Sequence, residues 1–357
     1  MKSPLRLSLG SILVFVLPLF VGGVAFAQEP WQDLRPQPWQ RRSEPILSAR
    51  TTKQDWCKVV CYSPHVIHHD SLFRMWYLGT STASRTNDIC MGYAESVNGI
   101  DWTEHPNNPI LADADIPWGE FVQTPYILWD EEESVFKLWF ISGGVDRDAN
   151  RKITRNEQRL GYATSQDGIA WKVRPEPIYP SGRSPSVTKQ GPNSYRMWMG
   201  SRPDVEDQAS GELYTNIYEF NSTDGIRWKR GEQPVIRPSG VGTTTVYPCV
   251  IQDAGKYHMW YGCHVPGKFE LFYASSNDGS QWAVDHSTSA FPARTGEAFF
   301  DNRYTSTPCI VKTPDRYLLY YSARDMKTKY IDSEGRTRTD NVGVYAHIGV
   351  AELSRRR

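Results

Sequence analysis

The stretch STDGIRW, Ser222 to Trp228, places a hydroxyl, a carboxylate, a glycine and an indole within seven residues. Three further copies follow the same pattern: SVNGIDW (96–102), SQDGIAW (165–171) and SNDGSQW (276–282). An Asp or Asn side chain accepts backbone N–H groups in a tight turn, and the following glycine tolerates a positive φ. One copy carries Asn98 in place of Asp, so the charge is dispensable. We therefore predict that this motif, called the turn box below, is structural, with Ca²⁺ or sugar binding as the alternative.

Two more landmarks recur with the turn box in a fixed order. One is a proline at the start of an apolar stretch, and these prolines lie 61, 60, 63 and 60 residues apart: Pro64, Pro125, Pro185, Pro248 and Pro308. The other is an aromatic strand pattern: RMWYLG, KLWFIS, RMWMGS, HMWYGC and LLYYSA. Short apolar and aromatic runs separated by turn residues indicate four antiparallel strands per repeat. Five such repeats predict an all-β fold, a five-bladed β-propeller. A pair of β-sandwiches is the alternative, but it does not explain an even period near 60.

Both ends of the predicted propeller contribute to its last blade. The chain ends on IGVAEL (348–353), which corresponds to the third strand of a blade, and EPILS (44–48) precedes the first blade. A closed propeller leaves no free edge at its seam. We therefore expect the N-terminal segment to supply the missing outer strand and to close the ring.

The first 27 residues have the pattern of a signal peptide. Lys2 and Arg6 precede an apolar run that ends in Ala25-Phe26-Ala27, which predicts cleavage before Gln28. A retained membrane anchor is the alternative. We expect residues 28–357 to form a single domain that is secreted or periplasmic.

Composition excludes several classes of partner. Lys plus Arg and Asp plus Glu both number 40, so no net charge favours nucleic acid or an anionic membrane surface. The six cysteines show no metal-ligand spacing, and their disulfide pairing stays open. We predict neither a cofactor nor a metal site. The high content of Trp and Tyr suits both packing between blades and the stacking of sugars.

The predicted topology points to one face of the molecule. The segments before the prolines and the loops after the aromatic strands share the face opposite the turn boxes. Three of these loops are long and charged, those that follow residues 142, 200 and 322. Function concentrates on such loops, so we expect the site on this face. His264 is the only histidine that we expect to be well placed for it.

The pattern sPxVi…yrMWYxG…iGYAxSxDGixW…NPIL resembles the five-bladed glycoside hydrolases of families 43, 32, 68 and 130. The resemblance covers nearly all of residues 40–353. The turn box is also similar to the Asp box of sialidases, although it is one residue shorter. The resemblance implies a deep axial pocket that binds sugars, and hydrolysis or transfer at an anomeric carbon.

The resemblance fails at the catalytic positions. In those families the catalytic carboxylates commonly sit one or two residues before the blade proline. Here those places hold no acid: Tyr62-Ser63, Gln123-Thr124, Arg183-Ser184, Val246-Tyr247 and Ser306-Thr307. The usual pair of acids must therefore come from elsewhere, or the activity differs.

Other residues on the same face are candidates for the site. Three carboxylates are our candidate catalytic groups: Glu120, Asp301 and Glu212. Asp55 and Asp204 also lie in these segments. The candidate substrate-binding residues are Arg183, Gln123, Tyr62, Tyr247, Arg303, Tyr304 and Trp118. Arg183 takes the place of a family acid, so we expect it to point into the pocket. There it either clamps an anionic group of the substrate or pairs with a loop acid.

Three functions follow from these observations. The first is a secreted glycosidase that acts on a poly- or oligosaccharide. The second is a phosphorylase or a lyase-like enzyme that uses Arg183, Arg303 and tyrosines. The third is a propeller that binds carbohydrate without cleaving it, which the missing acids favour.

Overall fold

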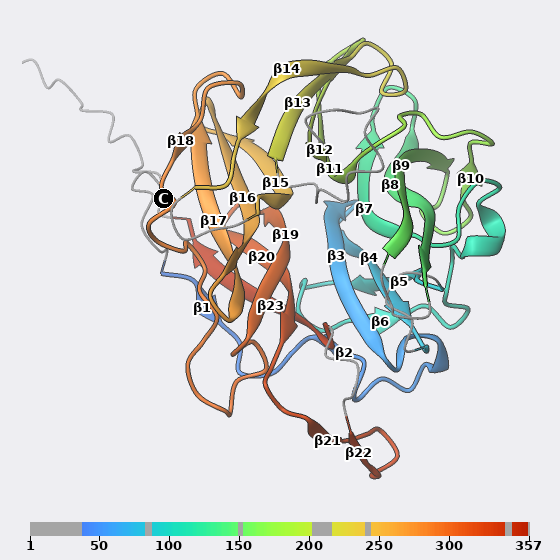
Figure 1. Ribbon diagram of the computed structural model, residues 1–357, viewed down its shortest axis with the longest axis vertical. Helices are drawn as coiled ribbons and strands as arrows, with labels where there is room; N and C mark the ends of the chain where they lie inside the picture. Colours follow the sequence, from blue (N-terminus) through green and yellow to red (C-terminus); the bar gives the residue numbers. More distant parts are fainter. Residues whose placement is uncertain are drawn as a thin grey trace, which may run out of the picture.

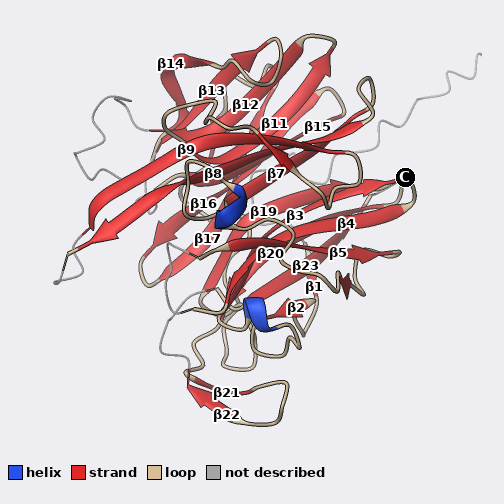
Figure 2. Ribbon diagram, turned by 90° about the vertical axis from the view of Figure 1, so that its right-hand side faces the viewer, coloured by secondary structure: helices blue, strands red, loops and turns tan. Residues whose placement is uncertain are grey.

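The computed structural model describes residues 38–82, 88–148, 153–201, 216–239, 244–339 and 345–355. Within these ranges the protein is all-β, and helix is limited to the 3-10 turns η1 (Asp55–Cys57) and η2 (Asp113–Asp115) (Figure 2). The described residues contain no helix with the length and apolar character that crossing a membrane demands.

The strands follow the sequence repeat, one four-stranded antiparallel unit after another. Units 1 to 3 are separate sheets. Unit 1 has strands β3 (Val60–His69), β4 (Leu72–Thr80), β5 (Cys90–Ser96) and β6 (Thr103–Glu104). Unit 2 has β7 (Gln123–Asp130), β8 (Val135–Arg147), β9 (Ile153–Ser165) and β10 (Lys172–Val173). Unit 3 has β11 (Arg183–Gly191), β12 (Ser194–Ser201), β13 (Asn216–Ser222) and β14 (Lys229–Ile236).

Units 4 and 5 belong to one nine-stranded sheet. Unit 4 has β15 (Val246–Asp253), β16 (Lys256–Val265), β17 (Lys268–Ser276) and β18 (Ala283–Val284). Unit 5 contains β19 (Tyr304–Lys312), β20 (Arg316–Arg324) and β23 (His347–Ser354). A single parallel pair, Phe269 with Tyr304, joins the two units. A separate hairpin, β21 (Lys329–Ile331) with β22 (Thr337–Thr339), projects from unit 5 (Figure 1).

The first strands of the units lie side by side around the middle of the molecule. Each first strand contacts the next one in a cycle: β3 contacts β7, β7 contacts β11, β11 contacts β15, β15 contacts β19, and β19 contacts β3. Figure 1 shows these strands toward the centre, with β10, β14 and β18 at the periphery. The arrangement is propeller-like.

Each first strand is distorted at its proline in the same way. The residue before the proline has a left-handed φ, between 42° and 58°, and these residues are Ser63, Thr124, Ser184, Tyr247 and Thr307. The pairing register with the second strand shifts at each of these places. Proline lacks an N–H donor and is tolerated at edge strands and bulges. The five bulges therefore bend the start of each first strand at the same level of the fold.

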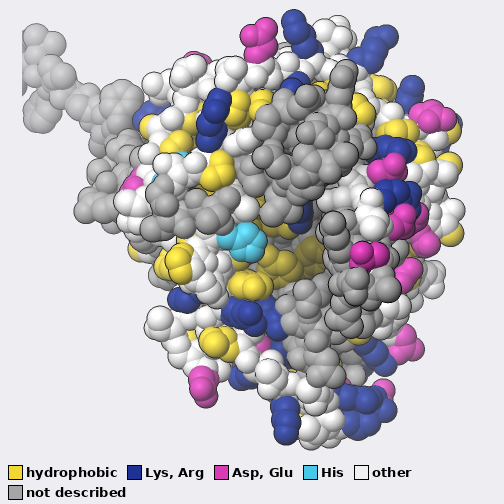
Figure 3. All heavy atoms as spheres, viewed as in Figure 1, with side chains coloured by type: hydrophobic (Ala, Val, Ile, Leu, Met, Phe, Trp, Pro, Cys, Tyr) yellow, Lys and Arg dark blue, Asp and Glu magenta, His cyan; other side chains and the backbone are white. Residues whose placement is uncertain are grey.

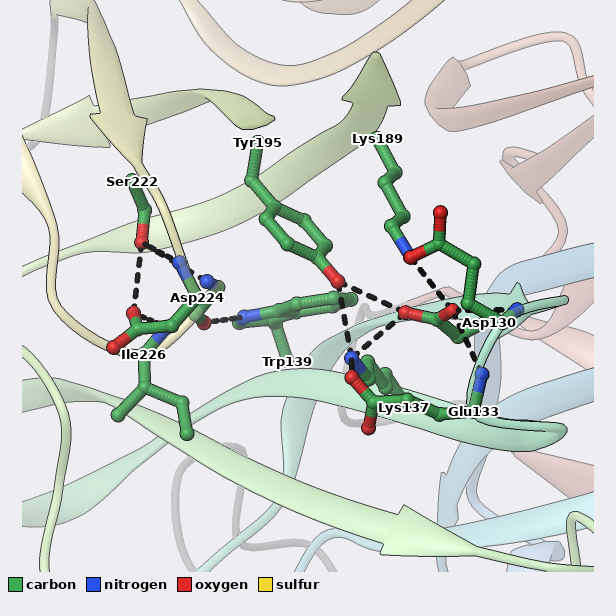
Figure 4. A network of polar contacts seen from close by, with 11 residues as sticks. Asp130, Glu133, Lys137, Trp139, Lys189, Tyr195, Ser222, Asp224 and Ile226 are labelled. Carbon is green, nitrogen blue, oxygen red and sulfur yellow. Dashed lines mark hydrogen bonds and ion pairs between the residues drawn. The ribbon is translucent and has the colours of Figure 1, made fainter. Parts of the chain in front are cut away.

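The turn boxes connect neighbouring units, as Figure 4 shows for unit 3. Asp224 Oδ1 accepts the N–H groups of Ile226 and Arg227 at 2.9 and 2.8 Å, and Gly225 has φ 72°. The carbonyl of Gly225 accepts the indole N–H of Trp139, in the second strand of unit 2, at 2.7 Å. The other boxes are built alike, with aromatic donors paired to glycine carbonyls as Trp76 to Gly168, Trp198 to Gly279 and Tyr320 to Gly99. The predicted structural role of the box is therefore matched by its contacts.

A second connection ties the units at the far ends of the first strands. The buried carboxylate of Asp130 accepts hydrogen bonds from Lys189 at 2.7 Å and from Tyr195 at 2.8 Å, both in unit 3 (Figure 4). Lys137 lies 2.7 Å from the same carboxylate. Burial alone would raise the pKa of Asp130, but these three partners hold that pKa well below its usual range. Tyr317 of unit 5 contacts Asp253 of unit 4 in the corresponding way.

The N-terminal segment pairs with the last strand, as the sequence predicts. β1 (Gln40–Arg41) and β2 (Leu47–Ser48) are both antiparallel to β23. Trp39, which is buried, packs edge-on against Trp260 of unit 4, with ring centroids 6.4 Å apart. Unit 5 has no turn box, so Trp39 lies against the aromatic residue that a box would otherwise face. The six cysteines, whose pairing the sequence leaves open, are all free thiols, and all but Cys90 are buried.

Candidate functional site

A cavity of two adjoining chambers lies on the axis, above the five proline bulges. One chamber, of about 140 Å³, is lined by Val60, Tyr62, Ile89, Gln123, Thr124, Arg183, Tyr247 and Tyr345. The other, of about 110 Å³, is lined by Thr244, Val246, His264 and Phe269 together with the shared residues Arg183, Tyr247 and Tyr345. At roughly 10–15 Å³ per water, the first chamber has room for about ten waters, which suits one sugar ring. Figure 3 shows this face hollowed near its middle, with side chains of the hydrophobic class, which includes tyrosine, at the base of the hollow.

The bulges place the lining side chains. Tyr62, Gln123, Arg183 and Val246 each stand two residues before a blade proline, and all four line the cavity. The first strand is an edge strand toward the axis, so its side chains at the bulge have no further strand to pack against. In units 1 to 4 the bulge thereby directs the side chain two residues before the proline toward the axis, with a different chemical type in each of these units.

Arg183 stands between the two chambers. Its Nη2 donates a hydrogen bond to the hydroxyl of Tyr247 at 2.8 Å, and the guanidinium carbon lies 5.3 Å from the centroid of that ring. Its Nε is enclosed and has no hydrogen-bond partner among the described residues. No ion pair of Arg183 with a carboxylate occurs within the described ranges, which leaves the alternative of a paired loop acid without support there.

Two further tyrosines wall the cavity. Tyr62 and Tyr345 stack in parallel, with ring centroids 5.7 Å apart and an interplanar angle of 3°. Burial raises the pKa of Tyr62 and of Tyr345 well above the usual range. Both are therefore neutral phenols, which offer hydroxyl hydrogen bonds rather than a base.

His264 lies at the edge of the second chamber, as the sequence predicts. Burial lowers the pKa of its imidazole, and the positive charge of Arg183 lowers it further. The ring packs edge-on against Phe269, with centroids 4.6 Å apart. The imidazole is therefore neutral at pH 7, and its surroundings are electropositive.

Tyr304 and Arg303 lie beside the cavity rather than in its lining. The ring of Tyr304 packs against Tyr345, with centroids 5.7 Å apart. The guanidinium carbon of Arg303 lies 5.2 Å from the centroid of the Tyr304 ring. These two residues therefore support the wall that Tyr345 forms.

Glu120 and Trp118 are placed away from the axial cavity. The carboxylate of Glu120 contacts Arg155 Nη2 at 2.5 Å, and its side chain is 44% exposed. Arg155 also binds Asp146 at 2.8 Å, so this is a surface ion cluster. Trp118 stacks on Phe140, with centroids 5.9 Å apart. Neither residue lines either chamber, and the catalytic role of Glu120 stays a prediction.

Asp301 is also absent from the lining of the cavity. Its carboxylate is fully buried and accepts hydrogen bonds from Arg294 at 2.5 Å, Tyr321 at 3.0 Å and Arg41 at 3.2 Å. Arg41 belongs to β1, so Asp301 anchors the N-terminal segment. These contacts give Asp301 a structural role, and its catalytic role stays a prediction.

The remaining acids do not supply a described catalytic group. Asp55 is exposed at η1 and pairs with Lys58. Glu212 and Asp204 lie outside the described residues. The lining of the two chambers, as far as the chain is described, contains no carboxylate.

Tyr345 is the main lining residue that the sequence reasoning missed. It stands two residues before β23, at the end of a long charged loop, and it contacts both chambers. Ile89 stands in a similar position, directly before β5. The sequence analysis predicts that the loops after the second strands face the site, so the last residues of these loops could have been proposed as lining residues.

Comparisons with known proteins give the fold a context. No protein-family model matches the chain. Two uncharacterised proteins of Mycobacterium tuberculosis, from strains CDC 1551 and H37Rv, are 34% and 33% identical to it over 99 residues. That match covers 28% of this chain and 32% of each relative, so the chain spans about a third of the length of these relatives.

Solved structures resemble the fold over most of its length. One comes from work reporting that family 130 of mannoside phosphorylases contains glycoside hydrolases that target β-1,2-mannosidic linkages in Candida mannan. It has a TM-score of 0.62 and 14% identity, and covers 95% of this chain and 96% of that one. A thermostable family-43 glycoside hydrolase has a TM-score of 0.58 and 15% identity, with 84% and 92% covered. An N-acetylgalactosamine deacetylase from F. plautii, in complex with a blood group B trisaccharide, has a TM-score of 0.64 and 15% identity, with 88% and 95% covered.

These likenesses define the fold as that of β-propeller-like glycoside hydrolases and related enzymes. The resemblance stated from the sequence motifs is therefore confirmed at the level of the fold.

Proposed function

We propose that this protein is a carbohydrate-active five-bladed β-propeller whose axial cavity receives one sugar unit of a poly- or oligosaccharide. The observation that carries the proposal is the cavity itself, where Arg183, Gln123 and three tyrosines converge in a fold shared with carbohydrate-active enzymes. Side chains with several hydrogen-bond donors and flat aromatic rings match the hydroxyl groups and the apolar faces of a sugar.

The proposed count of five blades rests on two repeated connections. The first strands contact one another in a cycle of five, and four aromatic residues donate to the turn-box glycine of the next unit. Pairing of β1 and β2 with β23 completes the fifth unit. An experimental structure with a different number of sheets around the axis would contradict this count.

Glycosidic cleavage is the reaction that we propose for the cavity. Hydrolysis needs two carboxyl groups, one to protonate the leaving oxygen and one to activate water or to attack. Glu212 is the remaining candidate for the first of these groups, because Glu120 and Asp301 are engaged elsewhere. Sugar binding without cleavage is the second candidate, favoured by a described lining that holds no acid.

Elimination is a third possibility, favoured by the Arg183–Tyr247 contact. In a uronic acid, an arginine neutralises the carboxylate while a tyrosine phenolate takes the proton from C5. The electron pair of the C5–H bond forms a C4=C5 double bond, and the C4–O bond breaks with its pair on the leaving oxygen, which is protonated. The product is an unsaturated sugar and a shortened chain, so no oxidant or metal is consumed.

One experiment separates these reactions. The protein is incubated with a panel of neutral and acidic polysaccharides, and reducing ends and the ultraviolet absorbance of new double bonds are both measured. Hydrolysis yields reducing ends alone, elimination yields both signals, and a binding protein yields neither while still retaining polysaccharide on affinity gels. We expect Glu212→Gln to abolish hydrolysis and Glu120→Gln, the matched surface control, to leave it unchanged. If the protein neither binds nor cleaves any polysaccharide of the panel, the proposed function is wrong.

We also propose that the protein is exported. The predicted signal peptide, residues 1–27, lies outside the described residues, so this proposal rests on the sequence pattern alone. N-terminal sequencing of the protein from the periplasm or the medium should begin at Gln28. A mature protein that keeps its first residues in a membrane fraction would support the anchor alternative.

A further inference from the structure

We propose that the axial cavity selects an acidic sugar, and that Arg183 binds the carboxylate of a uronic acid unit. This inference rests on the proposed carbohydrate function and names the substrate class of the same site. It is carried by a cation placed on the axis without a counterion among the described residues.

Three other enclosed arginines differ from Arg183 in their partners. Arg50 contacts Asp325 at 2.6 Å, Arg196 contacts Glu219 at 2.6 Å and Arg294 contacts Asp301 at 2.5 Å. Each of these guanidinium groups has its own carboxylate. Arg183 instead meets the hydroxyl of Tyr247, and its charge faces a cavity whose described lining holds no acid. A poorly solvated charge without a partner is costly, so a site that keeps one is prepared for an anionic ligand.

Most N–H donors of Arg183 have no partner among the described residues. A guanidinium has five N–H donors in a planar fork, and one of them is used by Tyr247. The Nε–H, which has no partner in the described structure, is enclosed beside the cavity. Two parallel N–H donors match two oxygens of a carboxylate, and equally two oxygens of a sulfate or phosphate. The carboxylate of a uronate is the anion that we propose, and the titration below compares it with the other two.

The surrounding groups complete an anion site. The hydroxyl of Tyr247 accepts from Arg183, so its own proton is free to donate to the ligand. Gln123 and Thr124 line the same chamber and can donate to an oxygen as well. His264 lines the second chamber together with Arg183, and burial and then the charge of Arg183 lower the pKa of its imidazole. Arg183, Tyr247 and Gln123 therefore form the proposed carboxylate-binding group.

Calorimetric titration of the full-length protein tests the proposal. The probes are uronic acid oligosaccharides, each beside its carboxyl-reduced counterpart, which keeps the sugar ring and loses the charge. We expect the acidic member of at least one pair to bind about tenfold more tightly or better. Arg183→Gln should abolish this preference, so that the acidic and the carboxyl-reduced sugar bind to the variant equally within about twofold. Arg227→Gln is the matched control, because Arg227 is 86% exposed on the turn box of unit 3.

The outcomes separate the inference from the function on which it rests. Equal binding of acidic and reduced sugars by the unmodified protein would overturn the acidic preference and leave the carbohydrate function standing. Binding of sulfated sugars or inorganic phosphate in place of uronates would overturn the assignment to a carboxylate. Binding of no sugar would overturn both proposals. If Arg183→Gln does not fold, Tyr247→Phe is used. An unchanged preference for the acidic sugar in that variant would contradict the proposed carboxylate-binding group.

Discussion

The indole N–H of Trp139 donates to the carbonyl oxygen of Gly225, which lies 86 residues later in the chain. The same oxygen accepts the indole N–H of Trp228, the last residue of the same turn box, at 3.0 Å. A carbonyl oxygen has two lone pairs, and here both serve indoles from different units. The backbone oxygen of Gly225 therefore joins the Trp of its own turn box to the Trp of the preceding unit.

Trp139→Phe should lower the free energy of unfolding by about 2–3 kcal/mol. The change removes one hydrogen bond and shrinks a side chain that is fully buried. Gly225→Ala should cost about 1–3 kcal/mol, because φ is 72° and an added Cβ would meet the Trp139 ring at 3.1 Å. Both losses can be measured by denaturant unfolding.

Gly191→Ala is the matched control for the glycine substitution. Gly191 has no positive φ, and an added Cβ would meet nothing within 4 Å. Its stability should stay within about 0.5 kcal/mol of the unmodified protein. Equal effects at Gly225 and Gly191 would show that the box turn does not restrict its glycine.

The carboxylate of the turn box should be replaceable by an amide. Asp224 uses Oδ1 to accept two backbone N–H groups, and Asn98 does the same in unit 1, at 2.9 Å to Ile100. Asp224→Asn should therefore change stability by less than about 1 kcal/mol, whereas Asp224→Ala should cost about 1–3 kcal/mol. Sugar binding should be unchanged in Asp224→Asn. Loss of sugar binding by a stable Asp224→Asn protein would revive a ligand role for the box.

Much of the fold is readable from the sequence because its signals are local and repeated. Each unit begins with a first strand, and a proline lies near the beginning of each of these strands. Each box must turn tightly, and Asp224-Gly225 and its counterparts mark that turn. The pairing of Leu47–Ser48 with the last strand was predictable as well, because the final unit lacked one strand.

The site was harder to predict, because a site residue needs a side chain that points toward the axis as well as a suitable place in the repeat. The bulge geometry made Arg183 and Tyr62 predictable, since the repeat places their counterparts on the axis. Asp301 and Glu120 also precede first strands, but nearby arginines, Arg294 and Arg155, turn their carboxylates elsewhere. Both carboxylates and Arg294 lie on loops between strands, so these pairings leave no periodic trace in the sequence.

Asp301→Asn should act on stability rather than on chemistry. The carboxylate is fully buried against Arg294, Tyr321 and Arg41. Loss of its charge leaves two guanidinium groups without their anion, at a cost of about 3–5 kcal/mol. Thermal unfolding and limited proteolysis near Arg41 measure the effect, and sugar binding per folded molecule should persist. A stable Asp301→Asn protein that has lost only its turnover would restore the catalytic assignment.

Stability should fall as the pH drops from about 6.5 toward 4. Burial lowers the pKa of His65 to about 4, against a raising contribution from its hydrogen bond to Ile127, and burial likewise lowers the pKa of His258 to about 4. In this window the unfolded chain binds more protons than the folded one, so acid favours unfolding. The difference from an ordinary value of 6.5 amounts to roughly 3 kcal/mol for each histidine.

Comparison of His65→Gln with the unmodified protein isolates one of these two contributions. Unfolding free energies are measured between pH 7.5 and pH 4.5, and the variant should show the shallower dependence. Its amide can still donate to the carbonyl of Ile127, which His65 Nε2 contacts at 2.8 Å. Parallel curves for the two proteins would assign the acid sensitivity to other groups, including His347, whose pKa is also lowered by burial.

Trp39→Ala tests whether the N-terminal segment holds the molecule together. Trp39 packs edge-on against both Trp260 and Phe291, each with ring centroids 6.4 Å apart, so it bridges unit 4 and the segment that leads to unit 5. Removal of a buried indole costs about 3–5 kcal/mol. Because β1 and β2 complete the last unit, the variant should also expose β23 to hydrogen exchange. Val97→Ala is the control, since Val97 is 80% exposed. Unchanged exchange of β23 in a destabilised Trp39→Ala protein would show that Trp39 only fills space, and that the seam is closed by strand pairing alone.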